Sequence, residues 1–203
     1  GRMKSDQKNI YYITGDNEAT LKNSPLLEMY NEKKVEVLIM DQDIDEFVIP
    51  TINKYKEHDL KSVNFSDAAD DLQTDDEKKD ETNLKPLLKK MKKVLGEQVK
   101  DVTASSRLKD SPSCIVADSN DPTAKMQELM KAMGQPGQQD IKPILEINPS
   151  HAIIIKLKNM KKSKSFDDIS QLLLDQAVLL EGAKLKNPTD FVDRLNTILT
   201  ESL

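Results

Sequence analysis

Few residues in this chain have the types and spacing that catalysis requires. The two histidines, His58 and His151, lie far apart and lack the spacing of a metal-binding pair. The single cysteine, Cys114, lies in an apolar run, which favours a small buried side chain over a reactive thiol. The six glycines are scattered, and residues 134–137 (Gly-Gln-Pro-Gly) lack the lysine and the helix of a phosphate-binding loop. We therefore predict no catalytic residues, no metal, no cofactor and no enzyme activity for this chain by itself.

The densest run of charge lies between residues 66 and 82. It holds eight aspartate or glutamate residues, two lysines and one large apolar side chain, Leu72. Such a composition is typical of a solvated, partly helical linker, because it offers little apolar surface to bury. A divalent-metal site is the less favoured alternative, since no oxygen-ligand loop with a turn glycine is present.

One helix-like stretch, residues 122–133, carries side chains suited to binding rather than to catalysis. Met126, Leu129, Met130 and Met133 recur at the spacing of one helical face. Packing against its own domain is the ordinary role of such a stripe. Methionine, however, is flexible and polarisable, so it also suits a surface that contacts varied partners. Under the second interpretation we expect the stripe to be at least half exposed.

The elements that position these residues follow from the apolar pattern and from capping signals. The first 64 residues predict the order β-α-β-α-β, and therefore a small parallel sheet covered by helices. Its strands are expected at 10–14, 35–40 and 61–64. Ser24 and Pro25 predict one helix start, and Asp43 with Glu46 has the spacing of a capping box at another.

The rest of the chain predicts a second domain, which makes the whole an α+β protein. The apolar spacing from Leu84 to Leu95 predicts an amphipathic helix that ends at Gly96. Three short strands are expected at 99–105, 114–118 and 141–147. Asn148 and Pro149 predict a helix start before a run of isoleucines, although that run also has strand character.

The last two predicted helices, 166–180 and 188–199, have broad apolar surfaces. The first is expected to begin at a capping box of Ser165 and Asp168 and to end at Gly182. Leucines on several sides of this helix extend its apolar surface beyond one stripe. Two such helices cannot cover each other, so we expect them to pack against the rest of the domain and against a second copy of the chain.

Composition restricts the classes of partner. Of the 203 residues, 37% are hydrophobic and 32% are charged, which suits an elongated molecule better than one compact globule. The net charge of −5 argues against non-specific binding of nucleic acid or of an anionic membrane. No apolar run reaches the length of a transmembrane helix.

Several segments resemble the bacterial type of the ninety-kilodalton heat-shock chaperones in residues, order and spacing. They are residues 10–15 (Ile-Tyr-Tyr-Ile-Thr-Gly), 95–102, 106–108 (Ser-Arg-Leu), 145–149 (Leu-Glu-Ile-Asn-Pro) and 172–177 (Leu-Leu-Leu-Asp-Gln-Ala). The resemblance covers nearly the whole chain. It implies the end of the middle domain at 1–64, an acidic linker at 65–83 and the C-terminal dimerisation domain at 84–203. The nucleotide-binding domain of such an ATP-dependent chaperone would lie upstream.

The resemblance also implies a cytoplasmic stress-response protein with two kinds of partner, a second copy of itself and non-native client proteins. The implied dimer residues are Ile169, Leu172, Leu173, Gln176, Leu180, Phe191, Leu195, Ile198 and Leu199. The implied client-binding residues are Met126, Leu129, Met130, Met133 and Phe47. The chain ends without the acidic tail that recruits tetratricopeptide co-chaperones, so that partner is not implied. The alternative is a purely structural dimerisation module that makes no client contact.

Overall fold

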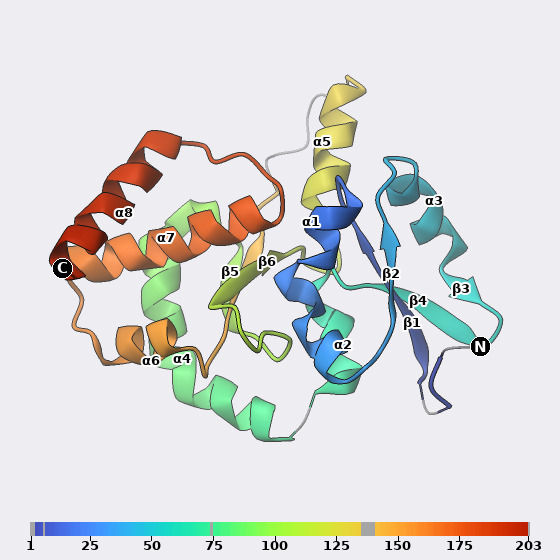
Figure 1. Cartoon of the computed structure of the whole chain (residues 1–203), viewed down its shortest axis with the longest axis horizontal. Coiled ribbons are helices and arrows are strands. Elements are labelled where there is room, and N and C mark those ends of the chain that lie inside the picture. The colour runs from blue at the N-terminus through green and yellow to red at the C-terminus, as the bar shows by residue number, and fades with distance from the viewer. Residues whose placement is uncertain (1–2, 6, 74, 135–140, 203) are drawn as a thin grey trace.

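The computed structural model of the chain describes residues 3–5, 7–73, 75–134 and 141–202. Figure 1 shows two groups of elements side by side. One is a blue-to-cyan sheet with its short helices, and the other is a second sheet with longer helices coloured green to red. Each group contains one small mixed sheet, so the predicted α+β class is confirmed.

The first sheet has the strand order β2-β1-β4-β3. Its central strand β1 (Asn9–Thr14) pairs in parallel with β2 (Val37–Met40) and β4 (His58–Ser62), as the predicted β-α-β-α-β order requires. The sequence does not predict β3 (Lys54–Tyr55), which pairs antiparallel with β4. The turn of this hairpin includes Lys56, whose φ of 53° lies in the left-handed region. Lysine rarely adopts this conformation, so the sequence gives no indication of the turn.

Short helical segments surround this sheet. They are α1 (Glu18–Lys22), a 3₁₀ turn (Pro25–Leu27), α2 (Glu28–Glu32) and α3 (Asp45–Ile52). The predicted cap at Ser24 is confirmed, because its Oγ accepts the backbone N–H of Leu26 at 3.3 Å. Pro25 opens the 3₁₀ turn, so the α-helix itself begins only at Glu28.

The capping box predicted for Asp43 and Glu46 at the start of α3 is wrong. α3 begins at Asp45 and has no side-chain cap, and the Asp45 carboxylate instead accepts the backbone N–H of Gln42 at 3.1 Å. Glu46 is 4% exposed, and it accepts a hydrogen bond from the Thr123 hydroxyl at 2.9 Å. The Glu46 carboxylate therefore makes a tertiary hydrogen bond instead of the local cap that the sequence pattern predicts.

Part of the acidic segment is packed rather than solvated. Residues Ser66–Leu72 form a 3₁₀ helix in which Ala68 and Ala69 are at most 2% exposed. Asp71 accepts a hydrogen bond of 2.5 Å from the Tyr11 hydroxyl. The expectation of a solvated linker is therefore wrong for this part, because two alanines supply apolar surface that a count of charges overlooks.

The second sheet has the order β5-β7-β6. The strands are β5 (Asp101–Ala104), β6 (Ser113–Val116) and β7 (Ile144–Ile147). β5 and β7 lie within their predicted ranges, whereas β6 begins one residue before the predicted range 114–118. The helices of this group are α4 (Asp75–Leu95), α5 (Ala124–Ala132), α6 (Ala152–Asn159), α7 (Lys164–Leu180) and α8 (Pro188–Ser202). The apolar stripe of α4 is buried as predicted, at Leu84, Leu87, Leu88, Met91 and Leu95.

Two helix starts in this group differ from the prediction. α6 begins after His151, whose Nδ1 accepts a backbone N–H at 3.2 Å, rather than at Pro149. α7 begins after Ser163, whose Oγ accepts a backbone N–H at 3.3 Å, rather than at the capping box of Ser165 and Asp168. Both stretches hold several capping side chains within a few residues, and spacing alone does not select among them.

The two groups share a hydrophobic core. Tyr11 and Tyr30 from the first group lie in the same cluster of buried side chains as Leu108, Cys114 and Val116 from the second. Cys114 is 3% exposed, so its predicted burial is confirmed, and that burial raises the pKa of the thiol. The domain division at 1–64, 65–83 and 84–203 stays a prediction, and packing continues across it.

The buried side chain of Arg107 also joins the two groups. The Arg107 Nε atom lies 3.0 Å from the Glu146 carboxylate on β7, and both residues are at most 5% exposed. Nη1 of Arg107 donates to the carbonyl of Val63 at 2.7 Å, and Nη2 donates to the carbonyls of Phe65 and Ser66 at 3.0 and 3.1 Å. One side chain thus connects β7 with the segment that leaves β4.

Candidate functional site

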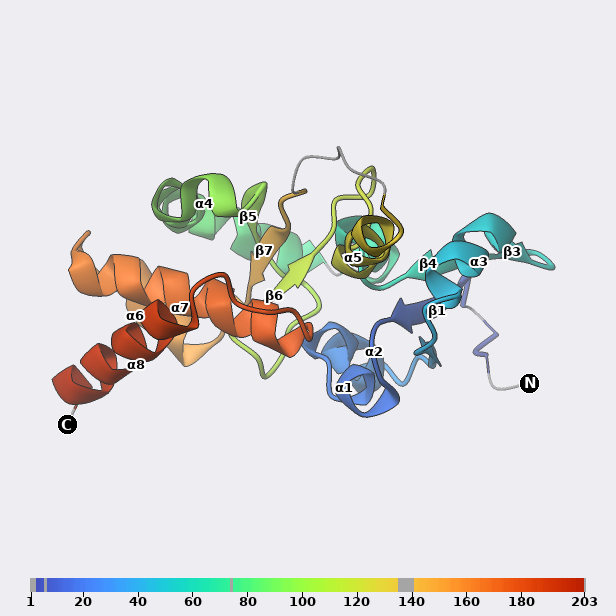
Figure 2. The same cartoon turned by 90° about the horizontal axis from the view of Figure 1, so that it is seen from above.

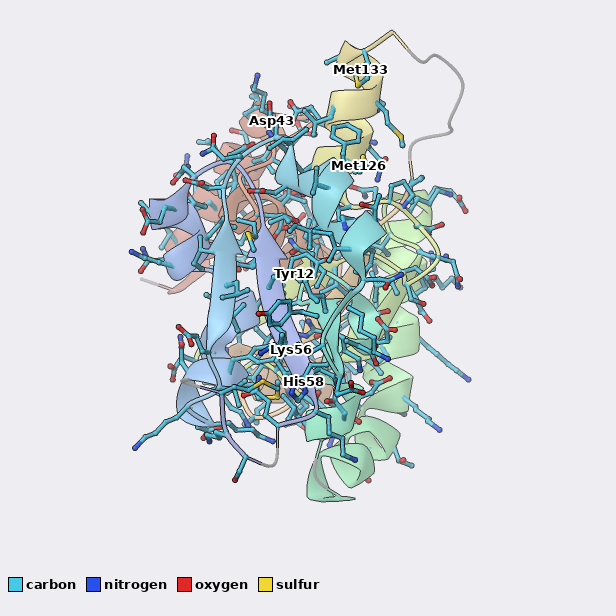
Figure 3. The ribbon with its side chains drawn as sticks, turned by 90° about the vertical axis from the view of Figure 1, so that its right-hand side faces the viewer. Tyr12, Asp43, Lys56, His58, Met126 and Met133 are labelled. Atoms are coloured by element: carbon cyan, nitrogen blue, oxygen red, sulfur yellow. The ribbon has the colours of Figure 1, made fainter. Side chains whose placement is uncertain are left out.

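The methionine helix α5 is fixed to the first group at its base. Thr123 caps the helix, since its Oγ1 accepts the backbone N–H of Met126 at 3.0 Å and donates to Glu46 on α3. Lys125 forms ion pairs with Asp16 and with Asp43, the second at 3.0 Å. Figure 3 shows Met126 near the base of α5, Met133 at its far end and Asp43 across from it. α5 is therefore anchored at one end and projects at the other, as Figure 1 also shows.

The predicted client-binding residues on α5 differ in exposure. Met133 is 66% exposed, whereas Met126, Leu129 and Met130 are half-buried. The expectation that all four are at least half exposed is therefore wrong for three of them. The reason is that α5 packs beside α3, and Phe47 on α3 is itself half-buried. The connecting residues 135–140, which include most of the predicted Gly-Gln-Pro-Gly loop, lie outside the described residues.

α3 contributes exposed apolar side chains that the sequence analysis missed. Ile44, Val48 and Ile52 are 61%, 41% and 47% exposed, and Tyr55 just beyond them is 59% exposed. Their spacing of four residues was the available signal, but it is also the spacing of a buried helical face. We use the term α3–α5 surface for the apolar side chains of these two adjacent helices, namely Ile44, Phe47, Val48, Ile52, Met126, Leu129, Met130 and Met133.

The helix pair α7 and α8 forms a second apolar surface. None of the described side chains of α8, residues 188–201, is buried. Figures 1 and 2 show why, because α8 lies at the edge of the molecule and packs mainly against α7. Arg194 on α8 holds the pair together through two residues of α7, Asp175 at 3.2 Å and Asp168 at 3.8 Å. It also lies 3.7 Å from Asp190 on α8 itself. Burial between the helices raises the pKa of Asp175, although Arg194 opposes that shift.

The predicted dimer residues fall into two classes. Leu172 and Leu173 are 6% and 2% exposed, so they face the interior of their own chain and leave little surface for a second copy. The other seven are accessible, with Leu180 and Leu199 exposed and Ile169, Gln176, Phe191, Leu195 and Ile198 half-buried. The prediction missed Leu179 and Val192, which are 45% and 48% exposed. Their role in a dimer stays a prediction.

A carboxylate at the end of α7 lies where the two groups meet. Glu181 accepts a hydrogen bond of 3.2 Å from the Asn64 side chain, whose amide also bonds both backbone groups of Thr14. Burial raises the pKa of Glu181 to about 7, against the lowering effect of the Asn64 hydrogen bond. The negative charges of Glu46 and Asp16 raise it further.

We expect Glu181 to make stability depend on pH. The pKa of Glu181 is higher in the folded chain than in the unfolded chain, so its stabilising proton is lost as the pH rises through about 7. Glu181→Gln should therefore raise the free energy of unfolding by about 1–3 kcal/mol near pH 8, allowing for partial exposure, and by less near pH 5. Urea unfolding at both pH values measures this effect, with the exposed Glu57→Gln variant as the control. An equal gain at both pH values would contradict the assignment.

The described residues offer little for catalysis. Within the ranges that the structure describes, no three His, Cys, Asp or Glu side chains are grouped closely enough to hold a metal ion. None of the described helices combines the length and the hydropathy that crossing a membrane requires. A cleft of about 910 Å³ opens between α5 and α7, and polar and apolar residues such as Gln127, Lys131, Leu174 and Val178 line it. What the geometry provides is surface for binding.

Comparison with known proteins identifies the family. Residues 1–203 match the family described as Hsp90 protein. Chaperone protein HtpG of Treponema denticola is 50% identical over 203 residues, which cover 98% of this chain and 32% of that protein. Chaperone protein HtpG of Treponema pallidum is 45% identical over 202 residues, with coverages of 98% and 32%. That of Campylobacter jejuni is 46% identical over 201 residues, with coverages of 98% and 31%.

The chain therefore belongs to the Hsp90 family of chaperones. Its relatives named above are bacterial HtpG proteins, which confirms the resemblance inferred from the sequence. The chain spans about a third of the length of these curated relatives.

Proposed function

We propose that this chain is the part of an HtpG-type chaperone that joins two copies and contacts non-native client proteins. The observation that carries the first half is α8, an apolar helix without a buried side chain among residues 188–201. Val192 and Leu199 are about half exposed, and Leu179 and Leu180 on α7 add to the same helix pair. Burying an aliphatic side chain contributes about 1.5–3 kcal/mol, so a second copy of this pair would stabilise both.

Support for client binding comes from the α3–α5 surface. Its exposed residues Ile44, Val48, Ile52 and Met133 are apolar and lie on two neighbouring helices. Flexible methionine side chains adapt to partners of different shape, at the cost of tight fit to any one partner. The alternative is a structural dimerisation module without client contact. The sequence leaves that alternative open, and the partial burial of Met126 and Met130 favours it.

The proposal also concerns the longer protein of which this chain would be one part. Family membership supports an ATP-driven activity for the whole protein in the cytoplasm, with the nucleotide bound by a part other than this chain. By itself the chain should then neither bind nor hydrolyse ATP. We propose no binding of nucleic acid.

Replacing Met133 with serine should separate the two interpretations. Because Met133 is 66% exposed, its truncation should leave the melting temperature almost unchanged. Affinity for an unfolded test protein, measured by fluorescence anisotropy, should fall about threefold or more, and further when Val48→Ser is added. Ile155→Ser on α6 is the matched control, since its side chain is 49% exposed and lies outside the α3–α5 surface.

The opposite result would favour the structural module. If Met133 were part of the core in solution, its truncation would cost about 2–5 kcal/mol and melting would fall sharply. A lowered melting temperature with client binding retained, or equal losses of client binding in Met133→Ser and Ile155→Ser, would defeat the client surface. Neither outcome would affect the dimer, which is tested separately.

A further inference from the structure

Positive charge in this acidic chain is concentrated in two segments. Residues 82–96 and 147–166 contain no aspartate or glutamate, although the chain has 35 acidic residues. Nine lysines in these segments are exposed: Lys85, Lys89, Lys90, Lys93, Lys156, Lys158, Lys161, Lys162 and Lys164. We call these nine side chains the basic patch. The first four belong to α4, and the others belong to α6, the α6–α7 connection and the first residue of α7.

The fold brings the two segments together. α4 packs against both α6 and α7. The Nζ atom of Lys90 lies 5.7 Å from the ring centroid of Phe166, two residues after Lys164. Figure 1 shows α6 and the connection to α7 beside α4 at the lower left of the molecule. A net charge of −5 for the whole chain therefore hides one strongly basic region.

The lysines of the basic patch form no ion pair with any described carboxylate, unlike lysines elsewhere on the surface. Lys22, Lys54, Lys61 and Lys100 each lie within 3.5 Å of an aspartate or glutamate oxygen. Among the side chains that the structure describes, acidic groups approach the basic patch at its margin, where Asp167 follows it in the chain and Glu201 lies 3.2 Å from Ser165. Nine ammonium groups without a described counter-charge on one region create a field that attracts an anionic partner.

The apolar side chains within the basic patch indicate which anionic partner it fits. On α6, Ile153 and Ile155 are 40% and 49% exposed, directly beside Lys156 and Lys158. Residues 82–96 and 147–166 contain no arginine, and their one aromatic residue, Phe166, is buried. Nucleic-acid surfaces rely on arginine forks and on exposed aromatic rings. Lysines around exposed isoleucines are instead typical of helices that lie on an anionic lipid surface.

We propose that the basic patch binds the surface of an anionic phospholipid membrane. The lysine ammonium groups lie against the lipid phosphates, and the exposed isoleucines of α6 enter the boundary between head groups and acyl chains. Contact is peripheral and falls with salt, because it depends on screened charge. It uses a region of the chain separate from the α3–α5 surface, so it is independent of client binding.

Vesicle co-sedimentation with the full chain tests the proposal. Vesicles of phosphatidylglycerol and phosphatidylcholine in equal parts should bind it, and vesicles of phosphatidylcholine alone should not. Binding should be lost when salt is raised from about 0.05 M to about 0.5 M. Replacing Lys156, Lys158 and Lys162 with glutamine should weaken binding about tenfold or more, whereas the same change at Lys22, Lys54 and Lys56 should alter it less than about twofold.

Further variants and a nucleic-acid probe complete the test. Ile153→Ser with Ile155→Ser should also weaken vesicle binding, with the melting temperature and the light-scattering mass unchanged. If these isoleucine changes alter the mass, the region belongs to self-association, and the membrane proposal is overturned. Binding of fluorescent single-stranded DNA without binding of anionic vesicles would overturn it in favour of a nucleic-acid surface. Equal losses from the two sets of lysine changes would overturn it as well.

Discussion

Val192→Asp should convert the proposed dimer into a monomer. Val192 is 48% exposed on α8, where no described side chain among residues 188–201 is buried, so a charge there should not disturb the folded chain. In a dimer the same position would be covered, and an unpaired carboxylate would have to lose its water, at a cost of several kcal/mol. Light scattering at micromolar concentration should give about twice the 22.9-kDa chain mass for the parent and one chain mass for the variant.

A matched substitution makes this result specific. Ile52→Asp places the same charge on α3 at an apolar residue of nearly equal exposure, 47%. It should leave the mass unchanged, because α3 lies outside the proposed interface. Leu195→Asp, one turn along α8 from Val192, should act as Val192→Asp does, although its half-buried position also affects packing on α7. A parent chain that is monomeric at this concentration, or a dimeric Val192→Asp, would remove α8 from the interface.

The sequence predicts those parts of the fold that depend on long, strongly patterned runs. The strand at 10–14 and the α4 stripe from Leu84 to Leu95 are as expected, because burial of these side chains is set by their own periodicity. The starts of α3, α6 and α7 are not, because α6 and α7 depend on which of several neighbouring polar side chains makes the cap, and α3 begins without a side-chain cap. At Glu46 the choice is made by Thr123, which lies 77 residues away in the chain.

The candidate site shows the same limit. The stripe is helical from Met126 to Met130 as predicted, and Met133 follows the last residue of α5. The burial of the stripe depends on α3 beside it, which no local pattern reveals. Leu172 and Leu173 have the apolarity of interface residues, yet they face the interior of their own chain. Composition alone does not distinguish an apolar side chain that packs within its own chain from one that is exposed and available to a second chain. The net charge of −5 is likewise a sum over the whole chain, so it did not indicate the basic patch.

Arg107→Met should cause a large loss of stability. Arg107 is 1% exposed and pairs with Glu146, which is 5% exposed and also accepts a hydrogen bond of 2.7 Å from Ser105. Removing only the guanidinium leaves a buried carboxylate without its counter-charge and takes one hydrogen-bond donor from each of three backbone carbonyls. We expect the free energy of unfolding to fall by about 3–5 kcal/mol and the melting temperature by about 10 °C.

Two controls separate the buried pair from charge removal in general. Arg194→Met removes three longer contacts from a side chain that is 26% exposed, and should cost about 1 kcal/mol. Arg107→Met combined with Glu146→Met removes both buried charges and should recover part of the loss. A loss for Arg107→Met no larger than that for Arg194→Met would contradict the argument. Because Arg107 bonds carbonyls of the segment after β4 while pairing with β7, a large loss would mean that the two groups of elements unfold together rather than as independent domains.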